Sequence, residues 1–166
     1  GFPKLQKISS TDVSPRFTKT NNIRSLSAYN SRDYSMQFPF LKELTLKLRI
    51  PNEFFLNFQY LETLNVIENS LNFGKTISIS IPSSVKKLKL EGDFKNYSFQ
   101  FDDSEIKELT ISKCNHIPDW FNIFLQKDDT HLKKLTISKC SFNINEIAIY
   151  RAKIDEFRIE VESRKS

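Results

Sequence analysis

The hexapeptide Leu-Thr-Ile-Ser-Lys-Cys occurs twice in this chain, at residues 109–114 and again at residues 135–140. The three residues before each copy also match in type, with Ile-Lys-Glu at 106–108 and Leu-Lys-Lys at 132–134. A duplicate with matching neighbours indicates an internal repeat, which constrains the fold because a repeated unit buries its apolar face only when other units stack beside it. The chain is therefore predicted to be a solenoid.

Apolar residues recur at positions 1, 4 and 6 of each unit, and six units fit this pattern fully. Two degraded units precede them, with Ser10 and Ala28 at position 6. The first anchors of the eight units are Leu5, Ile23, Leu41, Leu61, Val85, Ile106, Leu132 and Ile154, spaced 18 to 26 residues apart. Alternation at positions 4 and 6 places side chains on one face of a short strand. Each unit is thus expected to contribute one strand to a parallel sheet.

This pattern resembles the leucine-rich repeat family, whose signature is L-x-x-L-x-L-x-x-N/C-x-L with a period of about 20 to 29 residues. Residues 61–71 meet the signature in full, with Asn69 at its N/C position, and Cys114 and Cys140 occupy the same position in later units. The resemblance implies that these side chains turn inward after the strand and hydrogen-bond the backbone of the bend. The other units depart from the signature with Val13, Ser31, Arg49, Asp93 and Glu162, so the solenoid is expected to be irregular.

The resemblance implies an α/β fold, a leucine-rich repeat solenoid of about eight irregular repeats. A curved parallel sheet would form its concave side, and helices and extended segments its convex side. Residues 1–166 would form a single domain. Because the chain begins without Met and stops just after a strand-like run, it is also expected to be a fragment of a longer protein. The Cys-type units are similar to those of F-box proteins, which are intracellular substrate receptors of cullin-type ubiquitin ligases.

The segments between strands carry their own patterns. Residues 50–59 (IPNEFFLNFQ) and 117–126 (IPDWFNIFLQ) place a proline before aromatic residues at helical spacing, so a helix is predicted in each. Residues 77–81 instead alternate isoleucine and serine before Pro82, which predicts an extended segment.

Few residues in the chain offer catalytic chemistry. The only histidines are His116 and His131, and three glycines are too few for a phosphate-binding loop. A zinc site formed by these histidines with Cys114 and Cys140 is one alternative, and a disulfide between the cysteines is another. The repeat accounts for both cysteines as buried thiols, and their spacing is not that of a zinc finger. We expect no enzymatic activity, no metal and no cofactor.

Binding is the remaining class of function, and the concave face is its expected location. Side chains between the anchors point outward there: Lys87, Lys89, Glu108, Thr110, Lys134 and Thr136, with Lys86, Lys107 and Lys133 at the edge. The lysines are predicted to form columns, either as a solvated surface or as a docking site for an acidic or phosphorylated protein segment or a nucleic-acid backbone. Ile67 on the same face is either an apolar contact or a scattered surface residue.

Composition narrows the expected partners. The net charge of +5 favours acidic partners without identifying nucleic acid, and two cysteines do not make a disulfide framework, so the cytoplasm or nucleus is expected. No apolar run reaches the roughly 18 residues that a membrane helix needs, so no membrane partner is expected. A protein partner is predicted, with a basic scaffold for nucleic acid as the alternative and a secreted receptor as a weaker third. The chain would be a monomer or a subunit of a hetero-complex.

The polar stretch at residues 9–22 (SSTDVSPRFTKTNN) has two readings. It is either a connector within a weak unit or a regulatory loop phosphorylated at Ser14, which precedes a proline.

Overall fold

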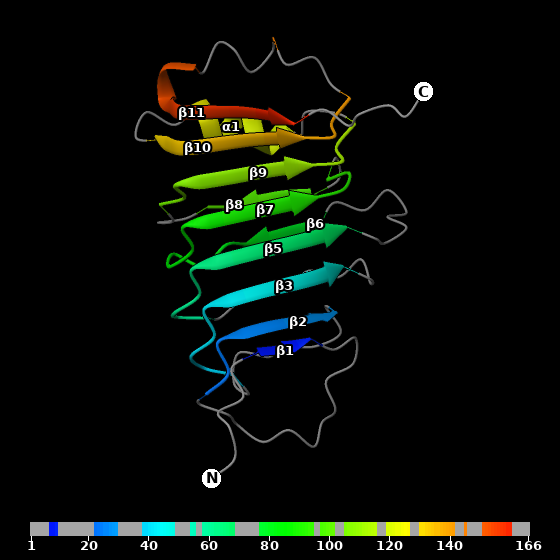
Figure 1. Cartoon of the computed structure of the whole chain (residues 1–166), viewed down its shortest axis with the longest axis vertical. Coiled ribbons are helices and arrows are strands. Elements are labelled where there is room, and N and C mark those ends of the chain that lie inside the picture. The colour runs from blue at the N-terminus through cyan, green and yellow to red at the C-terminus, as the bar shows by residue number, and fades with distance from the viewer. Residues whose placement is uncertain are drawn as a thin grey trace.

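The chain forms a solenoid of stacked parallel strands, as a computed structural model shows (Figure 1). The structure describes residues 7–9, 22–29, 38–48, 54–55, 58–68, 77–94, 97–101, 105–115, 119–126, 130–141, 145 and 151–160. Within these residues the strands form an eight-stranded sheet and a three-stranded sheet. The predicted solenoid is therefore confirmed.

The large sheet takes one strand from each predicted repeat, in chain order and with every neighbouring pair parallel. Its strands are β1 (Lys7–Ser9), β2 (Ser25–Tyr29), β3 (Glu43–Leu48), β5 (Thr63–Glu68), β7 (Lys87–Glu91), β9 (Glu108–Ser112), β10 (Leu132–Ser138) and β11 (Ile154–Glu160). The fourth-position residues align across the sheet in one row, namely Ile8, Leu26, Leu44, Leu64, Leu88, Leu109, Leu135 and Phe157. Both degraded units at the N-terminal end are part of this sheet.

Burial alternates along these strands as the sequence pattern predicts. In β3, for example, Leu44, Leu46 and Leu48 are buried while Thr45 and Lys47 are partly exposed. Strands β9 and β10 depart from this alternation, because Ser112 of β9 and Thr136 and Ser138 of β10 are buried as well. The last strand departs in the opposite direction, because Ile159 is 43% exposed whereas Ile137, at the same position in β10, is 2% exposed. Strand β11 ends the sheet and pairs only with β10 among the described strands, so its apolar face has cover on one side.

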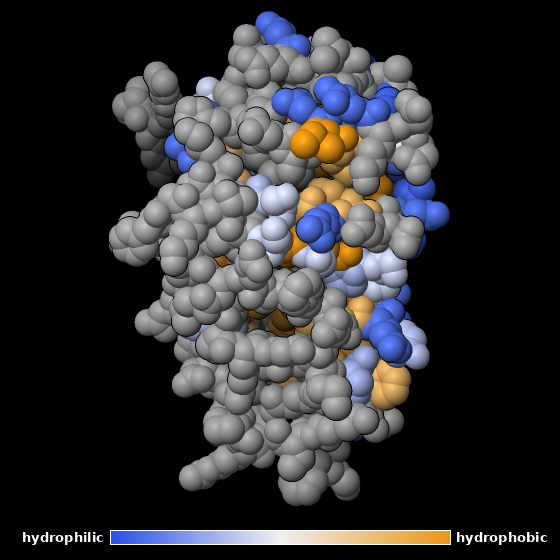
Figure 2. Space-filling view, turned by 180° about the vertical axis from the view of Figure 1, so that it is seen from behind, coloured by the Kyte–Doolittle hydropathy of each residue, from blue (hydrophilic) through white to orange (hydrophobic). Residues whose placement is uncertain are grey.

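A second layer lies behind the large sheet. It consists of the small parallel sheet β4 (Phe54–Phe55), β6 (Ile77–Ser80) and β8 (Tyr97–Gln100), and of helix α1 (Asp119–Gln126), which lies behind β10 and β11 (Figure 1). The predicted extended segment at 77–81 and the predicted helix within 117–126 are confirmed. Figure 2 shows this layer from behind, with hydrophobic and hydrophilic side chains side by side in its upper half.

The helix predicted for residues 50–59 is wrong, because Phe54 pairs with Ile79 and Phe55 with Ser80 as parallel strands. Phenylalanine favours strands, and a short apolar run is compatible with both the helical and the strand periodicity. Pairing with the neighbouring strand β6 therefore determines that this segment is a strand. Besides α1, the described residues include only the short 3₁₀ helix η1 (Arg151–Lys153) as a helix with defined bounds. The described fold is thus mainly parallel β-structure, with less helix than the predicted α/β class implies.

Aromatic side chains fill the space between the two layers. Phe94 and Phe99 contact edge to face with ring centroids 5.6 Å apart, and Phe99 lies 6.2 Å from Phe101. Phe101 in turn lies 4.7 Å from Phe124 of α1. All four rings are buried, and each contributes apolar area worth about 1.5–3 kcal/mol when removed from water. This continuous row connects the small sheet to the helix.

Three strands end in a bend with a positive φ angle. Gly92, Lys113 and Lys139 follow β7, β9 and β10 with φ of 116°, 56° and 53°. Each of these residues donates its backbone N–H to the last strand residue of the next rung, at 2.9 Å (Gly92 to Ser112 O), 3.0 Å (Lys113 to Ser138 O) and 2.9 Å (Lys139 to Glu160 O). The bends therefore continue the hydrogen-bond ladder beyond the strands.

We predict that Gly92→Ala lowers the free energy of unfolding by about 1–2 kcal/mol, because L-residues disfavour positive φ. A Cβ atom at this position would also lie 2.9 Å from the Glu68 Cβ and 3.0 Å from the Glu68 carbonyl oxygen. Urea denaturation measures the change. Lys113→Gly, at the equivalent bend one rung later, is the matched control and should leave stability unchanged or raise it. Equal stability of Gly92→Ala and the parent chain would contradict this account of the bend.

Candidate functional site

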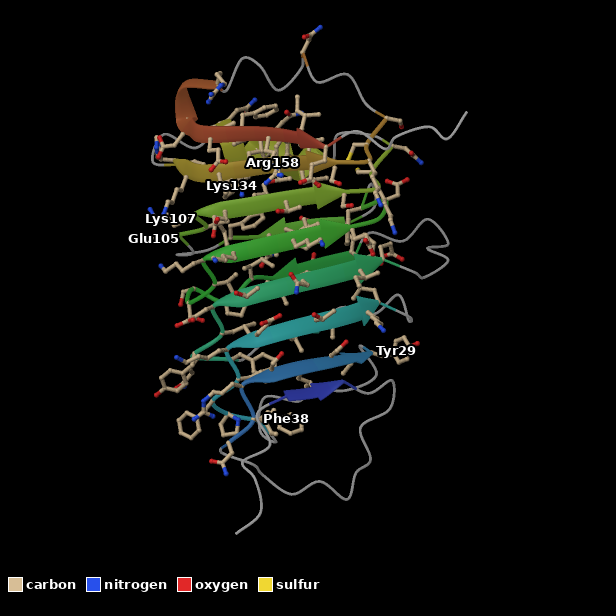
Figure 3. All side chains as sticks on the ribbon, in the orientation of Figure 1. Tyr29, Phe38, Glu105, Lys107, Lys134 and Arg158 are labelled. Atoms are coloured by element: carbon tan, nitrogen blue, oxygen red, sulfur yellow. The ribbon has the colours of Figure 1, made fainter. Side chains whose placement is uncertain are left out.

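The side of the large sheet that faces away from the second layer is called here the open face. Side chains on it stand in columns because the strands pair in register (Figure 3). One column carries Lys87, Glu108, Lys134 and Glu156, the next Lys89, Thr110, Thr136 and Arg158, and the third Glu91, Ser112, Ser138 and Glu160. The outward residues predicted from the sequence therefore do lie together on one surface.

This surface carries charges of both signs, so uninterrupted lysine columns do not form. From β7 to β11 the open face carries four cations (Lys87, Lys89, Lys134, Arg158) and four carboxylates (Glu91, Glu108, Glu156, Glu160). Lys87 Nζ lies 3.2 Å from Glu108 Oε2, and Lys113 Nζ lies 3.5 Å from Glu91 Oε1. Opposite charges are favourable between neighbouring strands. The face is consequently neutral in sum.

Two of the lysines predicted to bind a partner take no part in these ion pairs. Neither Lys89 nor Lys134 has an ion-pair partner within 4 Å in the part of the chain that the structure describes. Lys89 is exposed, and Lys134 is partly exposed in the column between Glu108 and Glu156. Thr136, by contrast, is only 7% exposed, with Thr110 and Arg158 as its neighbours in the register. It offers less contact surface than expected from the sequence.

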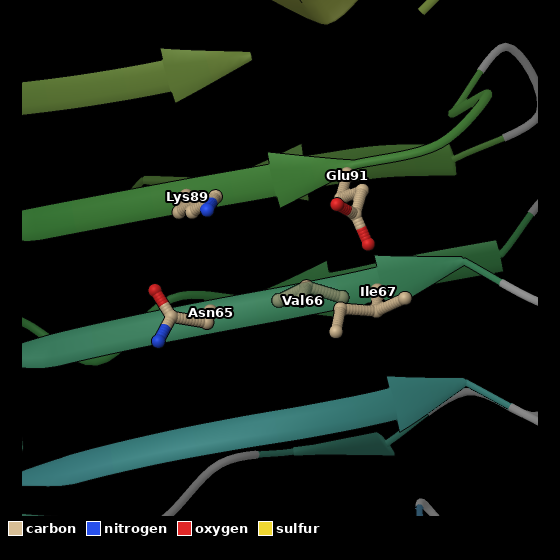
Figure 4. Close-up of a pocket in the computed structure, with 5 residues that line it drawn as sticks. All are labelled: Asn65, Val66, Ile67, Lys89 and Glu91. Atoms are coloured by element: carbon tan, nitrogen blue, oxygen red, sulfur yellow. The ribbon is translucent and has the colours of Figure 1, made fainter. Parts of the chain in front are cut away.

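A small hollow on the open face is lined in part by two of the predicted binding residues, Ile67 and Lys89 (Figure 4). It encloses about 110 Å³ and is lined by Asn65, Val66 and Ile67 of β5 and by Lys89 and Glu91 of β7. Ile67 is partly exposed here, and the Asn65 side-chain amide donates a hydrogen bond to Thr45 Oγ1 at 3.2 Å. The hollow thus combines an apolar floor with a charge of each sign.

The edge at which the strands begin carries a second set of charges, which we call the N-terminal edge. Lys42 pairs with Glu62 at 3.9 Å, Lys86 with Glu105 at 3.6 Å, and His131 with Asp155 at 2.7 Å. The exposed Lys107 and Lys133 on neighbouring rungs have no ion-pair partner among the described residues. Figure 3 places Lys107 and Glu105 at this edge, where β9 begins.

Two exposed aromatic residues on the same edge were not identified from the sequence. Phe40 and Tyr60 are 38% and 50% exposed, and their ring centroids lie 5.4 Å apart. Each directly precedes the first anchor of its unit, whereas the buried Phe38 and Phe58 lie two residues further upstream. The available signal was this offset, because Phe40 and Tyr60 stand in the turn or bend that leads into each strand. At Phe40 that turn is closed by a hydrogen bond from the Leu41 backbone N–H to the Phe38 carbonyl oxygen at 3.3 Å.

The cysteines occupy structural positions at the bends. Cys140 Sγ accepts a hydrogen bond from the Cys114 backbone N–H at 3.4 Å and lies 3.2 Å from the Ser138 carbonyl oxygen. Both residues are free thiols, and Cys114 is buried. The inferred role of this side chain in holding the bend is therefore seen at Cys140. Asn69, the third residue expected to act in this way, lies outside the described residues.

Burial also keeps Cys140 in its thiol form. Desolvation raises the pKa of the Cys140 thiol, although hydrogen bonds with the backbone of Cys114, Ser138 and Lys113 offset part of this effect. A raised pKa means less thiolate at neutral pH, and the thiolate is the nucleophile. Cys140 is poorly suited to nucleophilic chemistry.

The described residues include no group of three or more His, Cys, Asp or Glu side chains placed to hold a metal ion. His116, which belongs to the zinc alternative, lies outside them. None of the helices seen in the described segments has the length and apolar character needed to cross a membrane. Comparison of the chain with family models, curated proteins and solved structures gave no match.

We predict that iodoacetamide alkylates Cys140 in the folded chain at least several-fold more slowly than in the urea-unfolded chain at pH 8. The reason is its raised pKa and partial burial. The folded-chain rate should keep rising at pH values where the unfolded-chain rate has levelled off. Peptide mapping by mass spectrometry separates Cys140 from Cys114. Equal rates in the two states would show that the bend does not protect the thiol.

Proposed function

We propose that this chain is a leucine-rich-repeat-type solenoid that binds a protein partner on its open face and has no catalytic role. The observation that carries this proposal is the eight-stranded parallel sheet, one face of which is covered by a second layer while the other displays side chains in register. Repeat solenoids use such extended surfaces for binding.

The chemistry of the open face supports a protein partner with both charges and an apolar group. Its four cations and four carboxylates on β7 to β11 offer complementary sites for a mixed segment and less for a uniform polyanion. Lys89 and Lys134 are the cations with no internal ion pair to break, and Ile67 supplies an apolar contact beside Lys89. These three residues form the proposed recognition centre.

The Cys-type bends support a narrower proposal. Cys114 and Cys140 stand where the repeats of F-box proteins carry cysteine, so the partner would be a substrate of a ubiquitin ligase and this chain its recognition part. Fold resemblance alone does not determine function, and co-purification of ligase subunits with the protein tests this step.

Nucleic acid is the second candidate partner, favoured by the exposed Lys107 and Lys133 on the N-terminal edge. Glu62, Glu105 and Asp155 on the same edge oppose it, because carboxylates repel a phosphate backbone. Binding to nucleic acid would weaken steeply with salt, which distinguishes it from mixed protein recognition.

We predict that the double variant Lys89→Glu/Lys134→Glu loses a protein that the parent chain retains in a pull-down from native extract analysed by mass spectrometry. Reversing both unpaired charges should weaken binding by roughly tenfold or more, since each would then repel the group it attracted.

Lys139→Glu is the matched control, because Lys139 is also exposed but lies at the bend after β10. All variants should melt within a few degrees of the parent chain. If the double variant retains the same proteins as the parent chain, the open face is a solvated surface and the proposal fails.

A further inference from the structure

A depression of about 520 Å³ lies on the N-terminal edge next to the exposed aromatic pair. It is lined by Lys42, Gln59, Tyr60, Glu62, Thr63, Ser84, Lys86 and Lys87. Its walls therefore combine an aromatic ring, three lysines and one carboxylate. The depression adjoins the open face through Thr63 and Lys87, which are the first residues of β5 and β7.

Aromatic and cationic groups are stacked along this edge, one from each successive rung. The Arg24 guanidinium lies 5.6 Å from the centre of the Phe40 ring, and Phe40 contacts Tyr60. The residue at the equivalent position of the next rung is Ser84, directly before the anchor Val85. The row of rings thus stops at Ser84, and the depression opens here beside Tyr60. The Ser84 Oγ is buried and has no hydrogen-bond partner among the described residues.

The rungs beyond this space present positive charge. Lys86, Lys107 and Lys133 occupy the same position on three successive rungs, with Lys86 already paired to Glu105. Neighbouring strands are about 4.8 Å apart, so Lys107 and Lys133 lie roughly one and two rungs from Ser84 along the edge. An extended peptide covers about 3.3 Å per residue and turns every second side chain to the same side. Acidic side chains two and four residues from a bound ring would therefore lie about 6.6 and 13 Å further along the edge and reach these lysines.

We propose that the N-terminal edge binds an extended protein segment in which an aromatic residue is followed by acidic residues two and four positions later. The aromatic ring occupies the space beside Tyr60, and the acidic groups contact Lys107 and Lys133. A peptide is favoured over single-stranded nucleic acid because Glu62, Glu105 and Asp155 interrupt the lysines on this edge, which a continuous row of phosphates would oppose. This inference rests on the proposed protein-binding role and assigns part of the partner.

The test is fluorescence anisotropy with a labelled peptide that contains one tryptophan and aspartates two and four residues after it. We expect a Kd of roughly 100 µM or tighter for the parent chain. Three control peptides replace the tryptophan by alanine, replace the aspartates by asparagine, or move the aspartates seven residues away. Each control should bind several-fold more weakly, and an oligo-dT strand of equal length should bind more weakly than the first peptide.

Variants of the edge locate the site on the protein. Tyr60→Ala should weaken binding about tenfold by removing the stacking partner. Lys107→Gln/Lys133→Gln should weaken binding about three- to tenfold and reduce its salt dependence. Ile123→Ala, which removes an exposed apolar side chain on α1, and Lys139→Gln should leave binding unchanged. Thermal melts establish that each variant is folded.

The proposal is overturned if no peptide binds or if the peptide without tryptophan binds equally well. It is also overturned if folded edge variants bind the peptide as the parent chain does, or if oligo-dT binds more tightly than the peptide.

The pull-down separates the two proposals. Loss of the cellular partner by Lys89→Glu/Lys134→Glu but not by Tyr60→Ala would leave the proposed function standing and remove this inference. Loss by Tyr60→Ala alone would show that the edge, and not the open face, binds the partner.

Discussion

Parallel pairing between neighbouring rungs is the constraint on which the rest of the structure depends. The leucines at position 4 lie in a single row because every strand pairs with the next one without a shift, as Leu44, Leu64 and Leu88 show. A shift of one residue would turn these side chains to the open face and bring charged ones into the core. Burying each leucine is worth about 1.5–3 kcal/mol, so the register is strongly specified wherever the second layer covers the sheet. The side chains of the open face stand in columns for the same reason, because they belong to the same strands and share their register.

The register of the strands therefore also determines which side chains of the open face pair with each other. Because Lys87 and Glu108 are held opposite each other, they pair internally. Lys89 is left unpaired because its neighbours in the register, Asn65 and Thr110, are neutral. Lys134 stands between Glu108 and Glu156, but its ammonium group lies within 4 Å of neither carboxylate. The same holds at the N-terminal edge, where Phe40 and Tyr60 meet although 20 positions separate them in the chain. The residues that the repeats share thus build the framework. The residues that differ between repeats determine which groups remain available on its surface.

Much of this fold could be predicted from the sequence, because the 1-4-6 pattern reports directly which side chains are buried. The strands, the extended segment at 77–81 and the helix at 119–126 follow from periodicity. The segment at 54–55 could not be assigned, because its conformation depends on pairing with β6, which no local pattern reveals. The outward positions were also predictable, but ion pairing and the burial of Thr136 depend on how long side chains settle between strands. The exposed aromatic pair was missed because a phenylalanine beside an anchor resembles one more core residue.

The bends have a consequence for how such a chain can change in length. The amide of each described bend residue with positive φ donates to the following rung, so strand and bend together form a unit of fixed length, as in residues 109–114 and 135–140. Anchor spacings nevertheless run from 18 to 26 residues, and the strands stay in register throughout. Additional residues are therefore accommodated in the returning segments, where insertions disturb one rung's covering layer and leave its neighbours aligned. Evolution can lengthen or rebuild the back of any rung while the open face in front keeps its geometry.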